Sequence, residues 1–237
     1  MRQALQGPFS LPTKTDSRLK KGGRKSRGQS LVEMAITLPV LLMLFSGMVE
    51  MGFMLNYYLS LQDATRYAAR EYSNGNPFNT DPDTARNSSN WFYIDAAGAV
   101  YNQLAPIAGT NDTSVKTQLN GATDDVIITV YSVEGSSIVN IIPTPFGCSK
   151  DSSYHLYCNA KSAVSATDIQ NATAGLSGSI PCQGILVVEV YEEYHQVLGL
   201  PWMAPMGSPL LHAETIMPLP AVQPGEPNVP LTGATCS

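Results

Sequence analysis

A long apolar run near the N-terminus constrains the fold of this chain more than any other feature. Between Leu31 and Leu61 the only charged side chains are those of Glu33 and Glu50. The run supplies the roughly 20 apolar residues that a helix needs to cross a bilayer. A core helix and a cleavable secretory signal are the alternatives. Because a secretory signal has an apolar region of only about 7–15 residues, followed by a small-x-small cleavage site, we favour a retained membrane anchor.

Charge is distributed very unevenly along the 237 residues. Eight of the 14 Lys and Arg residues fall within the first 27 positions, where Asp16 is the only acid. Residues 29–237 hold six basic and 18 acidic groups, a formal net charge of −12. A basic cluster directly before an apolar run indicates the cytoplasmic side of a membrane, so residues after about 56 are expected outside it. The acidic remainder argues against a nucleic-acid surface.

Helical periodicity continues beyond the apolar run. The segment NYYLSLQDATRYAAREY (56–72) keeps three- and four-residue spacing, and Gly75 and Pro77 then break the pattern. One helix over residues 29–72 is expected, roughly 65 Å long at 1.5 Å per residue, with its membrane part at about 31–55. Pro39 leaves one carbonyl without its helical donor, so a local kink or loosening is expected there.

The rest of the chain divides by composition. Residues 1–28 are polar and basic, and they are expected to form a disordered cytoplasmic leader. Residues 73–217 are predicted to form a small α+β domain outside the membrane. Residues 218–237 contain five prolines and are expected to form an extended tail.

Hydrophobic spacing predicts an antiparallel sheet and one helix in the outer domain. WFYIDAAGAVYNQLA (91–105) has the pattern of a short amphipathic helix. Alternating, β-branched segments predict strands over residues 124–133, 136–143, 184–198 and 210–219. In 184–198, Glu189 and Glu193 face one way and Glu192 the other, so neither face is wholly apolar. This strand is therefore expected at a sheet edge or beside a partner.

Four cysteines lie on the predicted outer side of the membrane. An even number in an oxidising compartment favours disulfides, and four cysteines allow three connectivities. The favoured pairing joins Cys148 to Cys158 and Cys182 to Cys236. A zinc site is the alternative, because His155 lies between Cys148 and Cys158. The sequence has no CxxC pair, so no metal site and no cofactor are predicted.

One predicted strand carries the cluster Glu189, Glu192, Glu193 and His195. Such a group can bind a metal or act as acid and base, but a solvated acidic face is the favoured interpretation. The sequence also lacks a Walker A loop, a dinucleotide-binding fingerprint, HExxH and GxSxG. No catalytic residue is therefore predicted, and the chain is not expected to be an enzyme.

The junction between leader and apolar run has a distinctive pattern. Basic residues precede Gly28 and Gln29, and Glu33 is the fifth residue after the glycine. This resembles the class III signal of type IV prepilins, which a membrane aspartic peptidase cuts after the glycine on the cytoplasmic face. The longer segment RGQSLVEMAITLPVLLMLFSGMVEMG is similar to the TadE-like family of tight-adherence (Flp-type) pilus proteins. The family elements are represented here by Gly28–Glu33, Leu38–Pro39 and the Gly-x-x-Glu-x-Gly of Gly47–Gly52.

The resemblance implies a pilin-like α+β fold and a structural role. Expected is a minor pilin or pseudopilin of a Tad/Flp-type IV pilus or of its assembly and secretion machinery, in the bacterial inner membrane or an extracellular filament. The implied partners are a prepilin peptidase, other pilin-like subunits, an inner-membrane assembly platform and the lipid bilayer, with no nucleic acid. The alternative is a bitopic membrane protein with a ligand-binding or enzymatic outer domain. A shaft, tip or assembly-priming role is left open.

The two glutamates in the apolar run have different expected environments. Cleavage would leave an amine on Gln29, and a carboxylate in the apolar layer costs about 2.5 kcal/mol or more unless it is paired. Glu33 is therefore expected to pair with the Gln29 amine of a neighbouring subunit, the alternative being an extended side chain in the headgroup layer. Glu50, about 25 Å further along, is expected in contact with water at the outer interface. Gly47 and Gly52 would allow close helix approach there.

Overall fold

The computed structural model of the chain describes residues 27–78, 91–105, 118–134, 137–141, 148–165, 167–169, 171, 182–224 and 229. These residues divide into two compact units, which lie within Met1–Leu44 and Phe45–Ser237. The first holds the start of helix α1 (Arg27–Tyr72), and the second holds the rest of α1 together with the other described elements.

Helix α1 confirms the predicted long N-terminal helix and continues through Pro39. Every described side chain from Ser30 to Leu44 is exposed, although most are apolar. The range Ser30–Tyr72 includes a stretch that is long and apolar enough to cross a membrane, and that stretch is not buried in the protein. The alternative of a buried core helix is therefore wrong.

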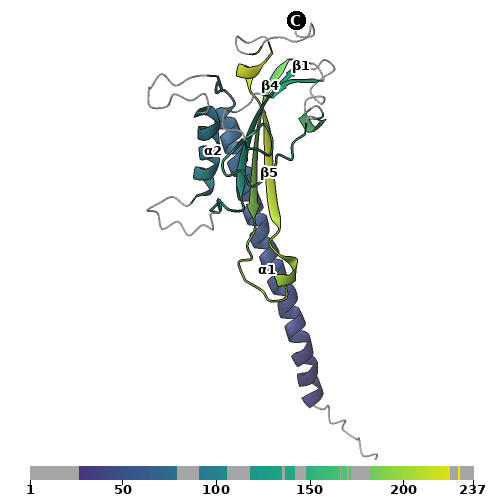
Figure 1. Cartoon of the computed structure of the whole chain (residues 1–237). Helices are drawn as coiled ribbons and strands as arrows, with labels where there is room; N and C mark the ends of the chain where they lie inside the picture. The colour runs from purple at the N-terminus through teal and green to yellow at the C-terminus, as the bar shows by residue number, and fades with distance from the viewer. Residues whose placement is uncertain are drawn as a thin grey trace, which may run out of the picture. The chain divides into compact units, whose positions relative to one another are not determined.

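The second unit contains an antiparallel sheet with the strand order β2-β1-β4-β5, and β3 pairs with β1 (Figure 1). The strands are β1 (Asp125–Glu134), β2 (Ser137–Ile141), β3 (Tyr154–His155), β4 (Gln183–Glu193) and β5 (Leu210–Pro218). β2 and β3 share the edge of β1 that faces away from β4. The predicted α+β class is confirmed.

One face of the sheet forms the main core with two helices. The C-terminal part of α1 and helix α2 (Trp91–Leu104) pack against this face (Figure 1). Small side chains let the helices approach closely, and branched strand residues fill the space between them. The buried members include Leu61, Ala64 and Ala68 of α1, Ala96, Ala97 and Val100 of α2, and Val126, Ile128, Val130, Leu186, Val188 and Val190 of the strands.

The other face of the sheet carries a smaller apolar cluster beside a polar region. Tyr131, Val133, Ile185 and Val187 pack there with Val164, from the segment of residues 148–165. β4 is paired on both sides, by β1 and β5, and is almost wholly buried. The predicted edge position of this strand is wrong, because both of its mixed faces are covered by other parts of the chain.

The start of the predicted tail belongs to the core. Leu219, Val222 and Val229 are buried in the main cluster, and Pro220–Val222 forms a short 3-10 helix, η2. The amide of Leu219 donates a 2.7 Å hydrogen bond to the carbonyl of Gly184. A β-carbon at Gly184 would collide with the Leu219 carbonyl and the Val222 side chain, so this close approach requires glycine.

Candidate functional site

The predicted processing residues lie at the start of α1. The helix begins at Arg27, so Gly28, Gln29 and Glu33 all have helical backbone. Gly28 and Glu33 are exposed. The hydroxyl of Thr37, one turn after Glu33, donates to the Glu33 carbonyl at 2.9 Å. Gly28 has no atom within 4 Å of an added β-carbon among the described residues.

Glu50 is the centre of a buried polar cluster in the second unit. Its side chain is only 2% exposed. One carboxylate oxygen accepts hydrogen bonds from the Tyr194 hydroxyl at 2.7 Å and the Val197 amide at 2.8 Å, and the other accepts from the Leu198 amide at 3.0 Å. We call these four residues the Glu50 cluster. The expectation that Glu50 is in contact with water is wrong, because the chain itself supplies the donors.

The Glu50 cluster determines where β4 ends. The strand was predicted to reach residue 198, but it ends at Glu193, and residues 194–209 form the β4–β5 loop. The amides of Val197 and Leu198 bind Glu50 instead of a neighbouring strand. The loop is closed at its base by the Tyr194 amide, which donates to the Pro209 carbonyl at 2.9 Å.

Because Glu50 is buried, these hydrogen bonds are needed to offset the cost of removing its carboxylate from water. A buried carboxylate is costly unless its oxygens are paired, and bonds to a charged acceptor are about twice as strong as neutral ones. Tyr57 packs edge-on against the Tyr194 ring, with centroids 5.3 Å apart. Burial and the bond to Glu50 raise the pKa of Tyr194, so this hydroxyl remains a donor.

The two motif glycines around Glu50 do not pack closely against any part of the chain that the structure describes. A β-carbon at Gly47 or Gly52 would have nothing within 4 Å among the described residues. Their predicted role, to allow another helix to approach closely, stays a prediction about contacts with neighbouring subunits.

The segment over the second sheet face is held by acidic side chains. His155 lies between Asp125, at 2.9 Å from Nδ1, and Asp151, at 2.7 Å from Nε2. Both ring nitrogens therefore donate, which requires the charged imidazolium. Burial opposes that charge, but the two carboxylates outweigh it and raise the pKa of His155. Asp125 also accepts the amides of Tyr157 and Asn159.

A disulfide joins Cys148 to Cys158, the pairing that the sequence favoured. Cys182 is also disulfide-bonded, and Cys236, its expected partner, lies outside the described residues. The zinc alternative is wrong for this state of the protein. Cys148 and Cys158 are bonded to each other rather than available as thiolates, and both nitrogens of His155 are occupied by carboxylates.

The predicted acidic cluster does not come together. Glu189 points to the second face and is buried, where it accepts from the Ser162 hydroxyl and the Ala163 amide. Glu192 is buried on the opposite face, whereas His195 is exposed in the β4–β5 loop. The favoured solvated face is therefore wrong as well. Residues 151–165 show no periodic pattern that could have predicted the donors Ser162 and Ala163 beside Glu189.

Two residues of β5 complete the surroundings of Glu189. His212 lies 3.2 Å from its carboxylate and 4.0 Å from that of Glu214. Ligand atoms of the three side chains lie within 4.8 Å of one another. The Glu189 carboxylate is already satisfied by protein donors, so the arrangement serves to hold the covering segment.

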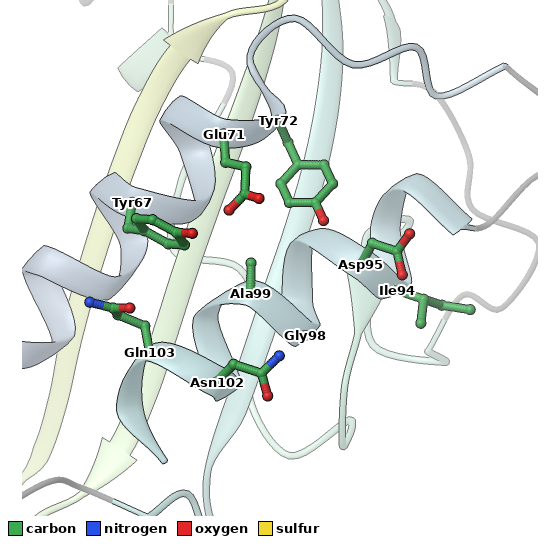
Figure 2. A pocket seen from close by; sticks show the side chains of 9 residues that line it. All are labelled: Tyr67, Glu71, Tyr72, Ile94, Asp95, Gly98, Ala99, Asn102 and Gln103. Atoms are coloured by element: carbon green, nitrogen blue, oxygen red, sulfur yellow. The ribbon is translucent and has the colours of Figure 1, made fainter. Parts of the chain in front are cut away.

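A hollow of about 400 Å³ lies between the end of α1 and α2. Figure 2 shows the carboxylates of Glu71 and Asp95 and the hydroxyls of Tyr67 and Tyr72 around it. It has no counterpart among the predicted site residues. Its lining is polar, and the hydrogen bond to the Glu71 carboxylate raises the pKa of the Tyr67 hydroxyl.

Comparison with known proteins identifies the N-terminal helix. A family model described as TadE-like protein matches residues 28–70. No curated protein and no solved structure matches the chain. The matched range begins at Gly28, includes Glu33 and Glu50, and ends two residues before α1 does. Over this helix, the chain is therefore similar to TadE-like proteins, as the sequence motifs predicted.

Proposed function

We propose that this protein is a pilin-like structural subunit, a minor pilin or pseudopilin, of a Tad/Flp-type IV pilus or of its assembly machinery. The observation that carries the proposal is the TadE-like match, which starts at the glycine of the prepilin-type signal. The exposed apolar surface of α1 from Ser30 to Leu44 also supports it, since this surface requires lipid or neighbouring subunits.

Processing after Gly28 is the first step of the proposed pathway. A prepilin peptidase cuts between Gly28 and Gln29, removes the eight leader cations and leaves an amine on Gln29. Before the cut, the basic leader holds the N-terminus on the cytoplasmic side of the inner membrane. The outer domain then lies on the opposite side, in an oxidising compartment that suits the disulfides.

The proposed assembly contact uses the two charges that remain at the start of the mature helix. The mature helix starts with one positive amine and carries one negative charge at Glu33, four residues later. Pairing Glu33 with the Gln29 amine of a neighbour would offset the cost of about 2.5 kcal/mol or more for a carboxylate in the apolar layer. We propose this contact as the one that sets the register between subunits, on the inner-membrane assembly platform.

We propose no catalytic role for the outer domain. Three of its buried carboxylates hold loops to the sheet: Glu50 holds the β4–β5 loop, and Asp125 and Glu189 hold the segment of residues 148–165. Such a use of carboxylates suits a rigid subunit, because each buried charge defines one arrangement of the backbone around it.

The test of processing uses two glycine variants in cells that contain a prepilin peptidase. Gly28→Ala should leave the chain at full length, whereas Gly22→Ala, inside the leader, should be shortened like the wild type. Identical shortening of both variants would overturn the proposal. An uncleaved but membrane-bound wild-type chain would instead favour the bitopic membrane protein.

The assembly contact is tested by Glu33→Ala. The variant should be inserted and cleaved, but it should be incorporated poorly into pili or assembly complexes, measured by immunoblotting of sheared pili and membranes. Glu33→Asp retains the charge and should recover part of the incorporation. Normal incorporation of Glu33→Ala would show that the pairing idea is wrong.

A further inference from the structure

The β4–β5 loop has an unusual composition. Its sequence, YHQVLGLPWMAPMGSP (194–209), contains no Asp, Glu, Lys or Arg, and acidic residues outnumber basic ones in the rest of the outer domain. The next charged groups are Glu193 before it and Glu214 after it. Large apolar side chains are the types most often buried, so an uncharged loop that exposes them suits a less polar environment.

The loop presents its apolar side chains outward. Val197, Leu198 and Trp202 are 46%, 42% and 44% exposed. These side chains do not enter the sheet core, which the main cluster fills without them. Several exposed apolar residues in one loop indicate a surface that is covered by a membrane or by another protein.

The loop has a defined conformation beside α1 (Figure 1). Glu50 binds the amides of Val197 and Leu198, and the Gln196 side chain donates to the Met203 carbonyl at 3.0 Å. A cavity of about 290 Å³ between loop and helix is lined by Met51, Met54 and Met203, among others. The exposed apolar residues of the loop are therefore held beside Glu50, at the same position along the axis of α1.

The helix at this level is apolar on its outer surface as well. Phe45, Met48 and Met51 are 62%, 74% and 50% exposed, within the same unit as the loop. At 1.5 Å per residue, Glu50 lies about 25 Å along the helix from Glu33. A hydrocarbon core is about 30 Å thick. If Glu33 is near the inner boundary, the Glu50 cluster is near the outer one.

We propose that the β4–β5 loop is a membrane-contacting element that lies in the outer headgroup region of the bilayer, with Trp202, Val197 and Leu198 in contact with lipid. The proposal rests on the proposed function, in which α1 is the membrane anchor. Trp is favoured at this depth because its ring is apolar while its N–H group donates to headgroups. The absence of charge in the loop and its continuity with the exposed apolar surface of α1 favour lipid over a protein partner.

This contact gives the outer domain a definite depth and rotation in the membrane. A single helix can rotate about its axis and tilt, whereas a helix with a second contact at one interface cannot do so freely. The Glu50 cluster couples the position of the loop to that of α1, because Glu50 on α1 binds the amides of Val197 and Leu198, whose side chains contact lipid in this proposal.

Tryptophan fluorescence of the full chain in vesicles tests the proposal. The chain has two tryptophans, Trp91 in α2 and Trp202 in the loop, so Trp91→Phe reports on Trp202 alone and Trp202→Phe is the matched control. The vesicles contain phosphatidylethanolamine and phosphatidylglycerol with a fraction of lipid brominated either near the headgroup or near the chain end. Trp202 should be quenched several-fold more by the shallow bromines, and Trp91 by neither.

Vesicle flotation distinguishes failure of the α1 membrane anchor from failure of the loop contact with lipid. If the chain does not float with the vesicles, the anchor fails and the loop proposal fails with it. If the chain floats and Trp202 is not quenched by either lipid, only the loop proposal is overturned. If Trp202 becomes shielded from aqueous iodide only as subunit density rises, without lipid quenching, a neighbouring subunit covers the loop, and lipid does not.

Discussion

The hydroxyl of Tyr194, at the end of β4, donates a 2.7 Å hydrogen bond to the buried carboxylate of Glu50 on α1. The two residues are 144 positions apart in the sequence, so this bond joins the TadE-like helix to the C-terminal part of the sheet. Two amides of the β4–β5 loop bind the same carboxylate. The glutamate of the Gly-x-x-Glu-x-Gly motif thus holds the outer domain to its helix.

Replacement of Glu50 should destabilise this connection. Glu50→Ala leaves three donors without their acceptor, and a buried unpaired polar group costs about 1–3 kcal/mol. Because the loop can relax toward water, we expect a net loss of about 2–4 kcal/mol, measured by urea unfolding of the detergent-solubilised chain. Hydrogen exchange at the Val197 and Leu198 amides should accelerate.

Tyr194→Phe is a milder variant for comparison, because it removes only one of the three donors to Glu50. It removes one donor and keeps the ring that packs on Tyr57, so it should cost about 1.5–3 kcal/mol without exposing the two amides. Equal stability and unchanged amide exchange in Glu50→Ala would contradict the role assigned to the cluster.

A second prediction concerns the contact between β4 and the start of the tail. Gly184→Ala forces a β-carbon against the Leu219 carbonyl and Val222. Overpacking of this kind costs about 1–3 kcal/mol. Gly98→Ala is the matched control, since a β-carbon there meets nothing within 4 Å and alanine favours the helix by about 0.5–1 kcal/mol. If both variants had the same urea midpoint, the close approach at Gly184 would be refuted.

Glu192 makes stability depend on pH. Burial and the nearby Asp124 charge raise the pKa of Glu192 from 4.5 to about 8. Between these values the folded chain binds a proton that the unfolded chain releases, so stability falls as pH rises, by at most about 1.4 kcal/mol per pH unit. Below pH 4.5 this contribution is fully present, and above about 8 it is lost.

Glu192→Gln should therefore flatten the stability profile between pH 5 and 8 and stabilise the chain most at the upper end. The raised pKa of His155 also makes stability fall with rising pH, as that residue loses its proton, and this part should persist in the variant. Glu193→Gln, the adjacent residue, is the control. An unchanged slope in Glu192→Gln, from urea midpoints at several pH values, would contradict the assignment.

The helix and the strands could be predicted from the sequence because their signals are local. The apolar run and the periodicity that follows it define α1, and β-branched alternation defines β1, β4 and β5. The two-residue β3 was not predicted, because Tyr154 and His155 are too few to show a period.

The surroundings of the acidic residues could not be predicted in the same way. Glu50 and Glu189 were expected in contact with water, but backbone amides from distant segments bind both of them. Amides from a distant segment bind Asp125 as well. Such contacts depend on the tertiary path of the loops at 148–165 and 194–209, which has no periodic signal. The residue type alone does not show whether a carboxylate is buried with amide donors or exposed to water.

The intact mass of the membrane-bound protein shows whether this chain is a processed, pilin-like subunit. The chain is purified from cells with and without a prepilin peptidase, and the two masses are compared. We predict that the peptidase removes residues 1–28 and leaves Gln29 as the first residue. A chain that retains residues 1–28 in the presence of an active peptidase would contradict the account.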